Sequence, residues 1–385
     1  MPLAGLILTD EDTLAPDAGV RALMPIAGQT LIEYQVRIAR ACGAAHIVVL
    51  VDRVPAPLEA AFERLRLDGI TFEVVRNASQ AADCIHPEEE LLVMAAGIVA
   101  ARGIVDHLAT KTMPTVVTLP DTDAVAHFER IDGTDRWAGL ALLNGRLLRE
   151  TAAMLGDWTL GPTLLRMALQ KGVERMPADG SGLSLVRTEQ EAMSVAQELA
   201  GRSRFGGGGF WQTQIVDPVV RRVLPQLLGQ KVTLELLTVF PGALMAAAML
   251  AGALGWISAS FGLFLLAGFP MAAAGVLGDI AARSDRALRW TADAKLPLLL
   301  ALLGFAGWAL DGPGLGWGPL VLALWAGIAL ILQPRTDVRE AWIADADIIA
   351  VEVFMASLIG QPVLGLMIAV FHSVLSQFWL VRRQS

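Results

Sequence analysis

The chain has 385 residues, 54% of them hydrophobic, and a mean hydropathy of +0.53. This is too apolar for one soluble domain of that length, so we expect at least two domains. The formal net charge of −8 argues against a nucleic-acid-binding protein, because no basic surface is available to neutralise phosphates. The apolar residues concentrate after residue 230, which predicts a polar first half and a membrane-embedded second half.

The first half has the features of a cytoplasmic domain. The N-terminus lacks a basic segment followed by an apolar core, so we predict no signal peptide. The two cysteines, Cys42 and Cys84, lack the spacing of metal ligands, which is typical of reduced thiols.

Apolar runs of strand length alternate with helical patterns over the first half. This alternation predicts βαβ units around a mostly parallel sheet. Ligands of such sheets bind at the carboxyl ends of the strands, so the loops after Thr9 and Ala95 are the predicted site. The predicted strands are Leu3–Thr9, His46–Val51, Thr71–Val75, Leu91–Ala95, Thr115–Leu119 and Trp137–Leu143. The predicted helices are Thr30–Cys42, Pro55–Leu67, Gly103–Thr110 and Gly145–Leu155.

One segment of this half carries a family resemblance. Arg21–Leu31, RALMPIAGQTL, resembles the Lys-x-Leu-x-Pro-x-x-Gly-x-x-Leu segment of the sugar-phosphate and alditol-phosphate nucleotidyltransferases. The strand before it, and the helix and strand after it, follow the order of that family. The resemblance covers roughly the first 200 residues and implies a Rossmann-like nucleotidyltransferase-type domain at residues 1–203, with CTP as a ligand.

The positions that carry catalysis in that family are changed here. The Gly-rich loop with an Arg is replaced by Asp10–Asp17, which holds four carboxylates that would repel a triphosphate. The catalytic Lys falls on Arg21, which keeps the charge and is the remaining candidate for nucleotide binding. The metal-binding Asp falls within Ala95–Gly97, and a second acid falls on or near Arg187. The resemblance therefore implies a retained scaffold with an inactive site.

Residues 204–233 form the predicted junction. Phe205–Phe210 is a glycine-rich turn, since it lacks the strand-then-helix context of a phosphate loop. The segment after it predicts a short amphipathic helix lying at the membrane surface. The alternative is an ordinary linker helix on the soluble domain. The residues expected on its apolar face, with Arg221 and Arg222 beside them, are Ile215, Val219, Val220, Val223 and Leu224.

Residues 234–385 predict a six-helix transmembrane domain. Basic residues lie before the first span, after the second and fourth, and at the tail, which places both termini and the charged segment Gly275–Lys295 in the cytoplasm. We therefore expect a multi-pass protein of the cytoplasmic (inner) membrane with the lipid bilayer as partner. The predicted spans are Leu234–Leu254, Ile257–Leu277, Leu296–Leu310, Leu315–Leu332, Ile348–Ile359 extended at both ends, and Val363–Val381.

Six spans after such a cytoplasmic domain resemble a known fusion, in which the nucleotidyltransferase domain is joined to a CDP-alcohol phosphatidyltransferase. The signature of that membrane family is Asp-x-x-Asp-Gly-x-x-Ala-Arg, eight residues, Gly, three residues, Asp, three residues, Asp. Its carboxylates hold two divalent metals on the CDP diphosphate, and the last Asp can deprotonate the attacking alcohol. The resemblance also implies a dimer, either a homodimer or a heterodimer with an active homologue.

The signature is only partly met in the charged segment. When it is anchored on Ala282-Arg283, Gly275 and Gly278 stand in place of the first two acids, and Asp279 stands in place of the signature Gly.

The downstream acids then fall on Leu296 and Leu300 or, with a shorter spacer, on Asp293 and Pro297. At most two of four carboxylates survive. The candidate catalytic residues that remain are Asp279, Asp293 and Arg283.

A carboxylate inside the fifth predicted span is a further candidate. Glu352 would be costly in lipid and so suggests function, or else it faces a polar cavity or pairs with a basic residue such as Arg339. Glu352 or Asp285 would have to substitute for a lost acid if Mg²⁺ or Mn²⁺ binds. The candidate metal ligands are Asp279, Asp293 and Glu352; without activity, no cofactor is expected.

Three hypotheses follow from these patterns. The first is a catalytically degenerate, auxiliary membrane protein of phospholipid head-group metabolism. The second is an active CDP-alcohol phosphotransferase with an altered metal site. The third is a membrane-bound scaffold or binding protein that is unrelated to nucleotides.

Overall fold

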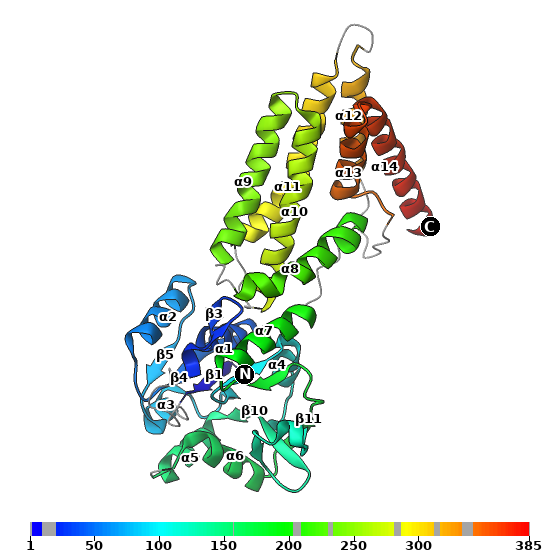
Figure 1. The fold of residues 1–385 in the computed structure, drawn as a ribbon. Coiled ribbons are helices and arrows are strands. Elements are labelled where there is room, and N and C mark those ends of the chain that lie inside the picture. The colour runs from blue at the N-terminus through cyan, green and yellow to red at the C-terminus, as the bar shows by residue number, and fades with distance from the viewer. Residues whose placement is uncertain are drawn as a thin grey trace. The chain divides into compact units, whose positions relative to one another are not determined.

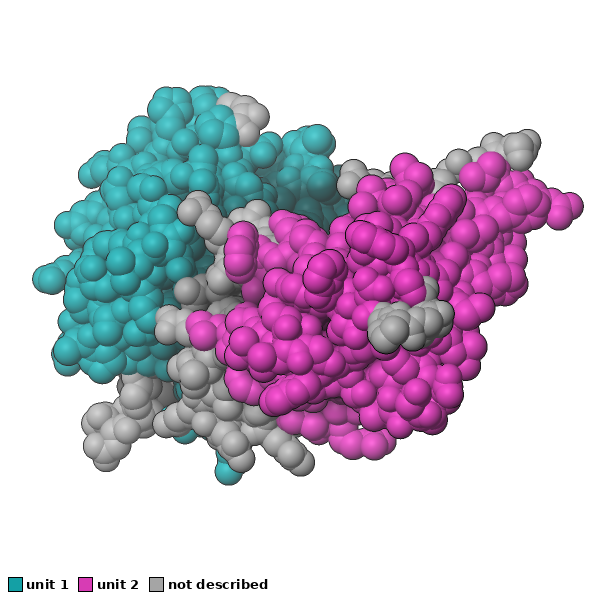
Figure 2. Space-filling view, turned by 90° about the horizontal axis from the view of Figure 1, so that it is seen from above, with its two compact units in different colours: residues 1–202, 280–283 teal, residues 203–279, 284–385 magenta. Residues whose placement is uncertain are grey.

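The structure is a computed structural model that describes residues 2–9, 21–156, 158–202, 209–229, 234–280, 286–311, 316–332 and 342–384. Its contacts divide the chain into two compact units, which Figure 2 colours separately. The α/β unit comprises Met1–Arg202 with Ile280–Arg283, and the helical unit comprises Ser203–Asp279 with Ser284–Ser385.

The α/β unit is built on an eight-stranded sheet with the order β11-β8-β10-β6-β1-β4-β5, and β9 pairs with β10 (Figure 1). Each of the six predicted strands is present within two residues of its predicted ends. The strands of this sheet are β1 (Leu3–Leu8), β4 (Ala44–Leu50), β5 (Glu73–Val75), β6 (Glu90–Met94), β8 (Thr115–Pro120), β9 (Glu129–Arg130), β10 (Asp135–Asn144) and β11 (Glu174–Pro177). Two small sheets pair β2 (Pro25–Ile26) with β3 (Gln29–Thr30) and β7 (Ile98–Ala100) with β12 (Leu183–Leu185).

The prediction of a mostly parallel sheet is confirmed with one exception. β1 pairs with β4 and β6 in parallel, as do β4 with β5 and β8 with β11, whereas β10 runs antiparallel to both β6 and β8. A parallel pair needs a crossover, usually a helix, and the connection from β8 to β10 holds only the short η2 (Asp123–Val125) and β9. The chain therefore turns back on itself there.

Helices flank this sheet, and four of them match the predicted ranges. Three others, α3, α6 and α7, were not predicted from the apolar periodicity. The helices are η1 (Arg21–Leu23), α1 (Leu31–Ala41), α2 (Ala56–Leu67), α3 (Ala78–Cys84), α4 (Arg102–Ala109), α5 (Gly145–Met154), α6 (Leu160–Gln170) and α7 (Glu189–Arg202).

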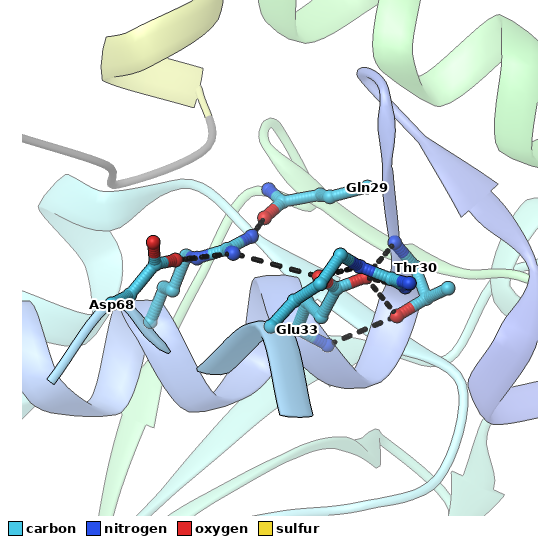
Figure 3. A network of polar contacts seen from close by, with 6 residues as sticks. Gln29, Thr30, Glu33 and Asp68 are labelled. Carbon is cyan, nitrogen blue, oxygen red and sulfur yellow. Dashed lines mark hydrogen bonds and ion pairs between the residues drawn. The ribbon is translucent and has the colours of Figure 1, made fainter. Parts of the chain in front are cut away.

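A polar network joins the start of α1 to α2 (Figure 3). Thr30 and Glu33 form a capping box, which explains why α1 begins at Leu31. Glu33 is buried and also accepts from Arg64 Nε and Nη2 at 2.9 and 3.0 Å. Burial alone would raise the pKa of Glu33, but the hydrogen bonds from Arg64 and Thr30 outweigh it and hold the pKa below its usual value. The six members are Gln29, Thr30, Glu33, Arg37, Arg64 and Asp68.

The helical unit contains a helix at each of the six predicted spans. Three of them hold stretches long and apolar enough to cross a membrane, namely Ile257–Gly278, Trp290–Ala309 and Pro362–Arg383. Shorter apolar stretches occupy Val239–Ala253 and Gly318–Ile331. Membrane association fits these helices, but six crossings are not established by their lengths. The elements are η3 (Gln212–Val216), α8 (Asp217–Gly229), α9 (Leu234–Ala253), α10 (Ile257–Ile280), α11 (Arg286–Ala309), α12 (Gly318–Ile331), α13 (Ala346–Leu358) and α14 (Pro362–Gln384).

The charged segment Gly275–Lys295 is mostly helical, which corrects its prediction as a loop. α10 continues to Ile280 and α11 begins at Arg286, so only residues 281–285, which lie outside the described part of the chain, separate them. The stretch from Arg286 to Lys295 contains Ala, Leu, Arg and Trp but neither Gly nor Pro, so nothing in it opposes a helix. The third predicted span, Leu296–Leu310, began too late because the charged residues before it also belong to the helix α11.

The junction helix also differs from its prediction. The five residues expected on one apolar face are divided between two faces: Val220 and Leu224 are buried, whereas Ile215, Val219 and Val223 are exposed. A five-residue π-helical stretch, η3, precedes α8 and shifts the register of the helix there.

Candidate functional site

The carboxyl end of β6 brings together the three segments that the resemblance assigns to catalysis. Gly97 follows β6 with φ +78°, and a Cβ built on it would lie 2.7 Å from Arg21 Cδ and 2.9 Å from the carbonyl oxygen of Val186. Val186 N–H donates to the Gly97 carbonyl at 2.8 Å, and Arg187 follows directly. The predicted positions in η1, after β6 and before α7 therefore meet at one corner, which requires glycine at its centre.

Two side chains of α1 hold this corner in place. Gln35 Nε2 donates to the carbonyl oxygens of Ala95 and Ile98 at 3.0 and 2.9 Å, and the Tyr34 hydroxyl donates to Ala100 at 2.7 Å. Both side chains are buried, and burial raises the pKa of the Tyr34 phenol. Tyr34 and Gln35 therefore fix the backbone after β6 and do not face a ligand.

The corner is chemically unsuited to a divalent metal. Ala95 and Ala96 present buried methyl groups at the position where the resemblance implies a carboxylate, and the side chain of Arg21 reaches the same corner through its Cδ. Among the described residues of the whole chain, no three His, Cys, Asp or Glu side chains are grouped so that they could hold a metal ion. The loop that replaces the Gly-rich phosphate loop, residues 10–20, lies outside the described residues.

A cavity of about 460 Å³ lies beside Arg187, between the end of β8, η2 and α7. Its lining includes His127, Arg187, Glu191 and Ser194, and Arg187 Nη2 pairs with Glu191 Oε1 at 2.9 Å. Burial and the charge of Arg187 lower the pKa of His127, so its imidazole is neutral at physiological pH. The volume suits a small polar molecule. Sequence analysis gave His127 no role, because its neighbours come from an unpredicted helix sixty residues away.

The helical unit gathers its own ionisable groups at one end of α13. Lys295 Nζ on α11 lies 2.6 Å from Asp347 Oδ2 in the first turn of α13, with side chains only 20% and 9% exposed. Asp345 caps the same helix by accepting from Ile348 N–H at 2.8 Å. A Cβ built on Gly209 would overlap the other Asp345 carboxylate oxygen, so the last glycine of the glycine-rich turn packs against this cap.

Glu352 is paired with a histidine that sequence analysis overlooked. Glu352 Oε1 lies 2.5 Å from His372 Nδ1 on α14, and His372 Nε2 lies 2.6 Å from the Trp342 carbonyl oxygen. A neutral imidazole has one N–H, whereas both of its nitrogens here face oxygen acceptors. A hydrogen bond therefore joins the two side chains, and Glu352 is engaged with His372. Arg339, the partner considered before, lies outside the described residues.

The structure does not bring the predicted metal ligands into one described group. Asp293 is exposed on α11, and Glu352 is paired with His372. The backbone of Asp279 lies in the last turn of α10, but its side chain falls outside the described part, as do Arg283 and Asp285. No sequence signal could have paired positions 352 and 372, because i to i+20 contacts depend on how α13 and α14 pack.

No protein-family model and no curated protein sequence matches the chain. Among solved structures, the chain is similar to a protein of Bacillus anthracis assigned as a glucose-1-phosphate thymidylyltransferase and determined with a sucrose. The identity is 15%, the TM-score is 0.39, and the match covers 53% of this chain and 98% of the other. At that score the likeness does not establish a common fold.

Proposed function

We propose that this protein is a catalytically degenerate, auxiliary membrane protein of phospholipid head-group metabolism. In this proposal the α/β unit is a nucleotidyltransferase-like domain, and the helical unit is a CDP-alcohol phosphatidyltransferase-like membrane domain. Neither turns over its ancestral substrate. The protein resides in the cytoplasmic membrane with both termini in the cytoplasm and associates as a homodimer or with an active homologue.

The corner around Gly97 is the observation that carries this proposal. Nucleotidyl transfer needs a divalent metal on the triphosphate, and carboxylates are the ligands that Mg²⁺ requires. Here Arg21 and the methyl groups of Ala95 and Ala96 occupy the positions that would supply them. A guanidinium carries a positive charge and offers no oxygen ligand, so Arg21 beside Gly97 cannot take the place of a metal-binding carboxylate.

The helical unit supports the same conclusion by a different route. Three of its acids already have partners: Asp347 with Lys295, Glu352 with His372, and Asp345 with the backbone of α13. The exposed Asp293 and the unassigned side chain of Asp279 are the acids left from the signature. Two carboxylates are too few to hold the two metals that grip a CDP diphosphate.

Ligand binding by the purified full-length chain tests the proposal. CTP and a CDP-alcohol are titrated in the presence of Mg²⁺, and again with Mn²⁺, by isothermal calorimetry in detergent. We expect no metal-dependent binding at millimolar ligand. Metal-dependent binding that is lost in Asp279→Asn and in Asp293→Asn would overturn the proposal and support an active phosphotransferase with an altered metal site.

The auxiliary role and the simple scaffold differ in their partners. The chain is purified from its native membrane under mild detergent, and the proteins that accompany it are identified. The auxiliary role predicts a phosphatidyltransferase with an intact Asp-x-x-Asp-Gly-x-x-Ala-Arg signature among them in stoichiometric amount. Its absence, with only unrelated proteins present, would favour the scaffold.

A further inference from the structure

The helix that runs from Phe210 through η3 and α8 carries two apolar stripes, not one. Its inner stripe is formed by Val216, Val220 and Leu224, which are 0%, 4% and 1% exposed. Its outer stripe is formed by Ile215, Val219 and Val223, which are 38%, 44% and 41% exposed. Both stripes recur every four residues, so each lies along one side of the helix. A helix of a soluble protein needs one apolar stripe, and the inner stripe already supplies it.

The inner side of this helix is fixed to the bundle through α10. The rings of Trp211 and Phe269 meet edge to face with centroids 6.5 Å apart, and Val216 Cγ2 is within 3.8 Å of a Cβ built on Gly268. Both α10 residues belong to a stretch that is long and apolar enough to cross a membrane. The junction helix therefore packs directly against a helix that is long and apolar enough to cross a membrane.

The helix meets the bundle at the level where charged side chains begin. Lys295 lies 6.0 Å from the ring of Phe264, one helical turn from Gly268, and pairs with Asp347. Gly209, just before the helix, packs against Asp345. Beyond this level the described parts of α10 to α14 contain Glu352 and His372 as titratable groups until the tail of α14. Such a change from charged to apolar marks a membrane–water boundary.

The polar residues of the helix complete an interfacial pattern. Arg222 is exposed and follows Val219 by three residues, so it flanks the outer stripe. Arg221 acts electrostatically on the buried Asp217, whose pKa burial raises above its usual value and which accepts from Gln212 Nε2 at 3.0 Å. The acid is thus turned inward, and the outer side of the helix presents apolar and cationic groups.

We infer that the outer stripe of this helix lies in the head-group layer of the bilayer, with Arg222 against anionic lipid phosphates. Branched apolar side chains at the acyl boundary and a basic residue at the phosphates are the combination that interfacial helices use. The inference goes beyond the proposed function, because it holds whether or not either unit is catalytic. The division of the apolar residues into two stripes supports this inference. The inner stripe is buried in the protein, so only the exposed outer stripe can contact lipid.

Site-directed spin labelling of the full-length chain in lipid nanodiscs tests this. Cys42 and Cys84 are first replaced by serine, and single cysteines are introduced as Val219→Cys, Val223→Cys and, as a control on the same helix, Gln214→Cys. We expect labels at 219 and 223 to be more accessible to oxygen, which partitions into lipid, than to a water-soluble nickel chelate. The label at 214 should show the reverse order. Water-type accessibility at 219 and 223, or shielding from both reagents by protein, would overturn the inference.

A second measurement keeps the native cysteines. The thermal unfolding midpoint of the full chain is compared in nanodiscs of zwitterionic lipid with and without phosphatidylglycerol. We expect anionic lipid to raise the midpoint, and Arg222→Gln to reduce that rise. Arg53→Gln, an exposed charge in the α/β unit, serves as the matched control and should leave it unchanged. Equal responses of the two variants would contradict a role for Arg222 at lipid phosphates.

Discussion

The ion pair between Lys295 and Asp347 joins α11 to α13 at the charged end of the helical unit, and removing one partner should destabilise this unit strongly. The atoms are 2.6 Å apart and both side chains are mostly buried. Breaking a buried pair by removing one partner costs about 3–5 kcal/mol. Because Lys295 keeps one-fifth of its exposure, we expect about 2–4 kcal/mol for a single substitution.

The two single substitutions should not be equivalent. In Asp347→Leu, the ammonium of Lys295 still acts on Asp345, which shares its surroundings. In Lys295→Met, the two carboxylates of Asp345 and Asp347 are left near each other without the Lys295 ammonium. Since like charges repel and each acid then lacks a counterion, Lys295→Met should be the more destabilising variant.

Joining both substitutions should restore much of the loss. Apolar residues of similar volume often replace a buried pair at little or no cost, so the double variant should unfold within about 1 kcal/mol of the wild type. The assay is unfolding in mixed detergent and SDS micelles, followed by far-UV circular dichroism for wild type, both singles and the double. If the losses of the two singles add up to that of the double, the side chains are not coupled and the reasoning is refuted.

Three further predictions concern other parts of the molecule. Glu33→Gln should destabilise the α/β unit by roughly 1–3 kcal/mol at neutral pH, because it removes the buried carboxylate that accepts from Arg64 and Thr30, whereas Arg37 keeps its ion pair with Asp68. The folded pKa of Glu33 lies below its usual 4.5, so the stabilisation that its carboxylate provides is present above that pH and is lost on acidification. In urea unfolding at a series of pH values, the difference in unfolding free energy between wild type and Glu33→Gln should therefore shrink as the pH falls through the folded pKa. Gly97→Ala should cost about 1–3 kcal/mol in the same assay, because its positive φ and crowded corner oppose a Cβ, whereas Gly103→Ala, with open space, should be nearly neutral. Glu352→Leu should lower the thermal midpoint in detergent more than Glu352→Leu combined with His372→Leu, and equal midpoints would argue against coupling between the two side chains.

Six strands and four helices of the α/β unit were predictable because each is encoded locally, whereas α3, α6, α7 and the short strands were not predicted. Continuous apolar runs such as Val48–Leu50 and Leu91–Met94 can be recognised without knowing what packs on them. The resemblance at Arg21–Leu31 also located the segments that meet at Gly97. The direction of β10 was not predictable from periodicity, because alternation is the same in parallel and antiparallel strands, and only the pairing partners decide it.

The helical unit was less predictable from its sequence than the α/β unit. Its apolar composition predicted six helices, but hydropathy cannot distinguish a charged residue in a loop from one that is neutralised inside a helix. The third predicted span therefore began only after Lys295, although Asp347, 52 residues later, compensates the charge of that lysine. The junction helix likewise offered five apolar residues with no sign of which side would face protein.

The sequence by itself determined most of the longer helices and strands and the apolar character of the second half. The tertiary structure alone decided which charges are paired, as with Glu352 and His372, and which apolar side chains of the junction helix face outward. The reason is physical: secondary structure follows from backbone periodicity over a few residues, whereas burial and ion pairing depend on neighbours brought from distant parts of the chain.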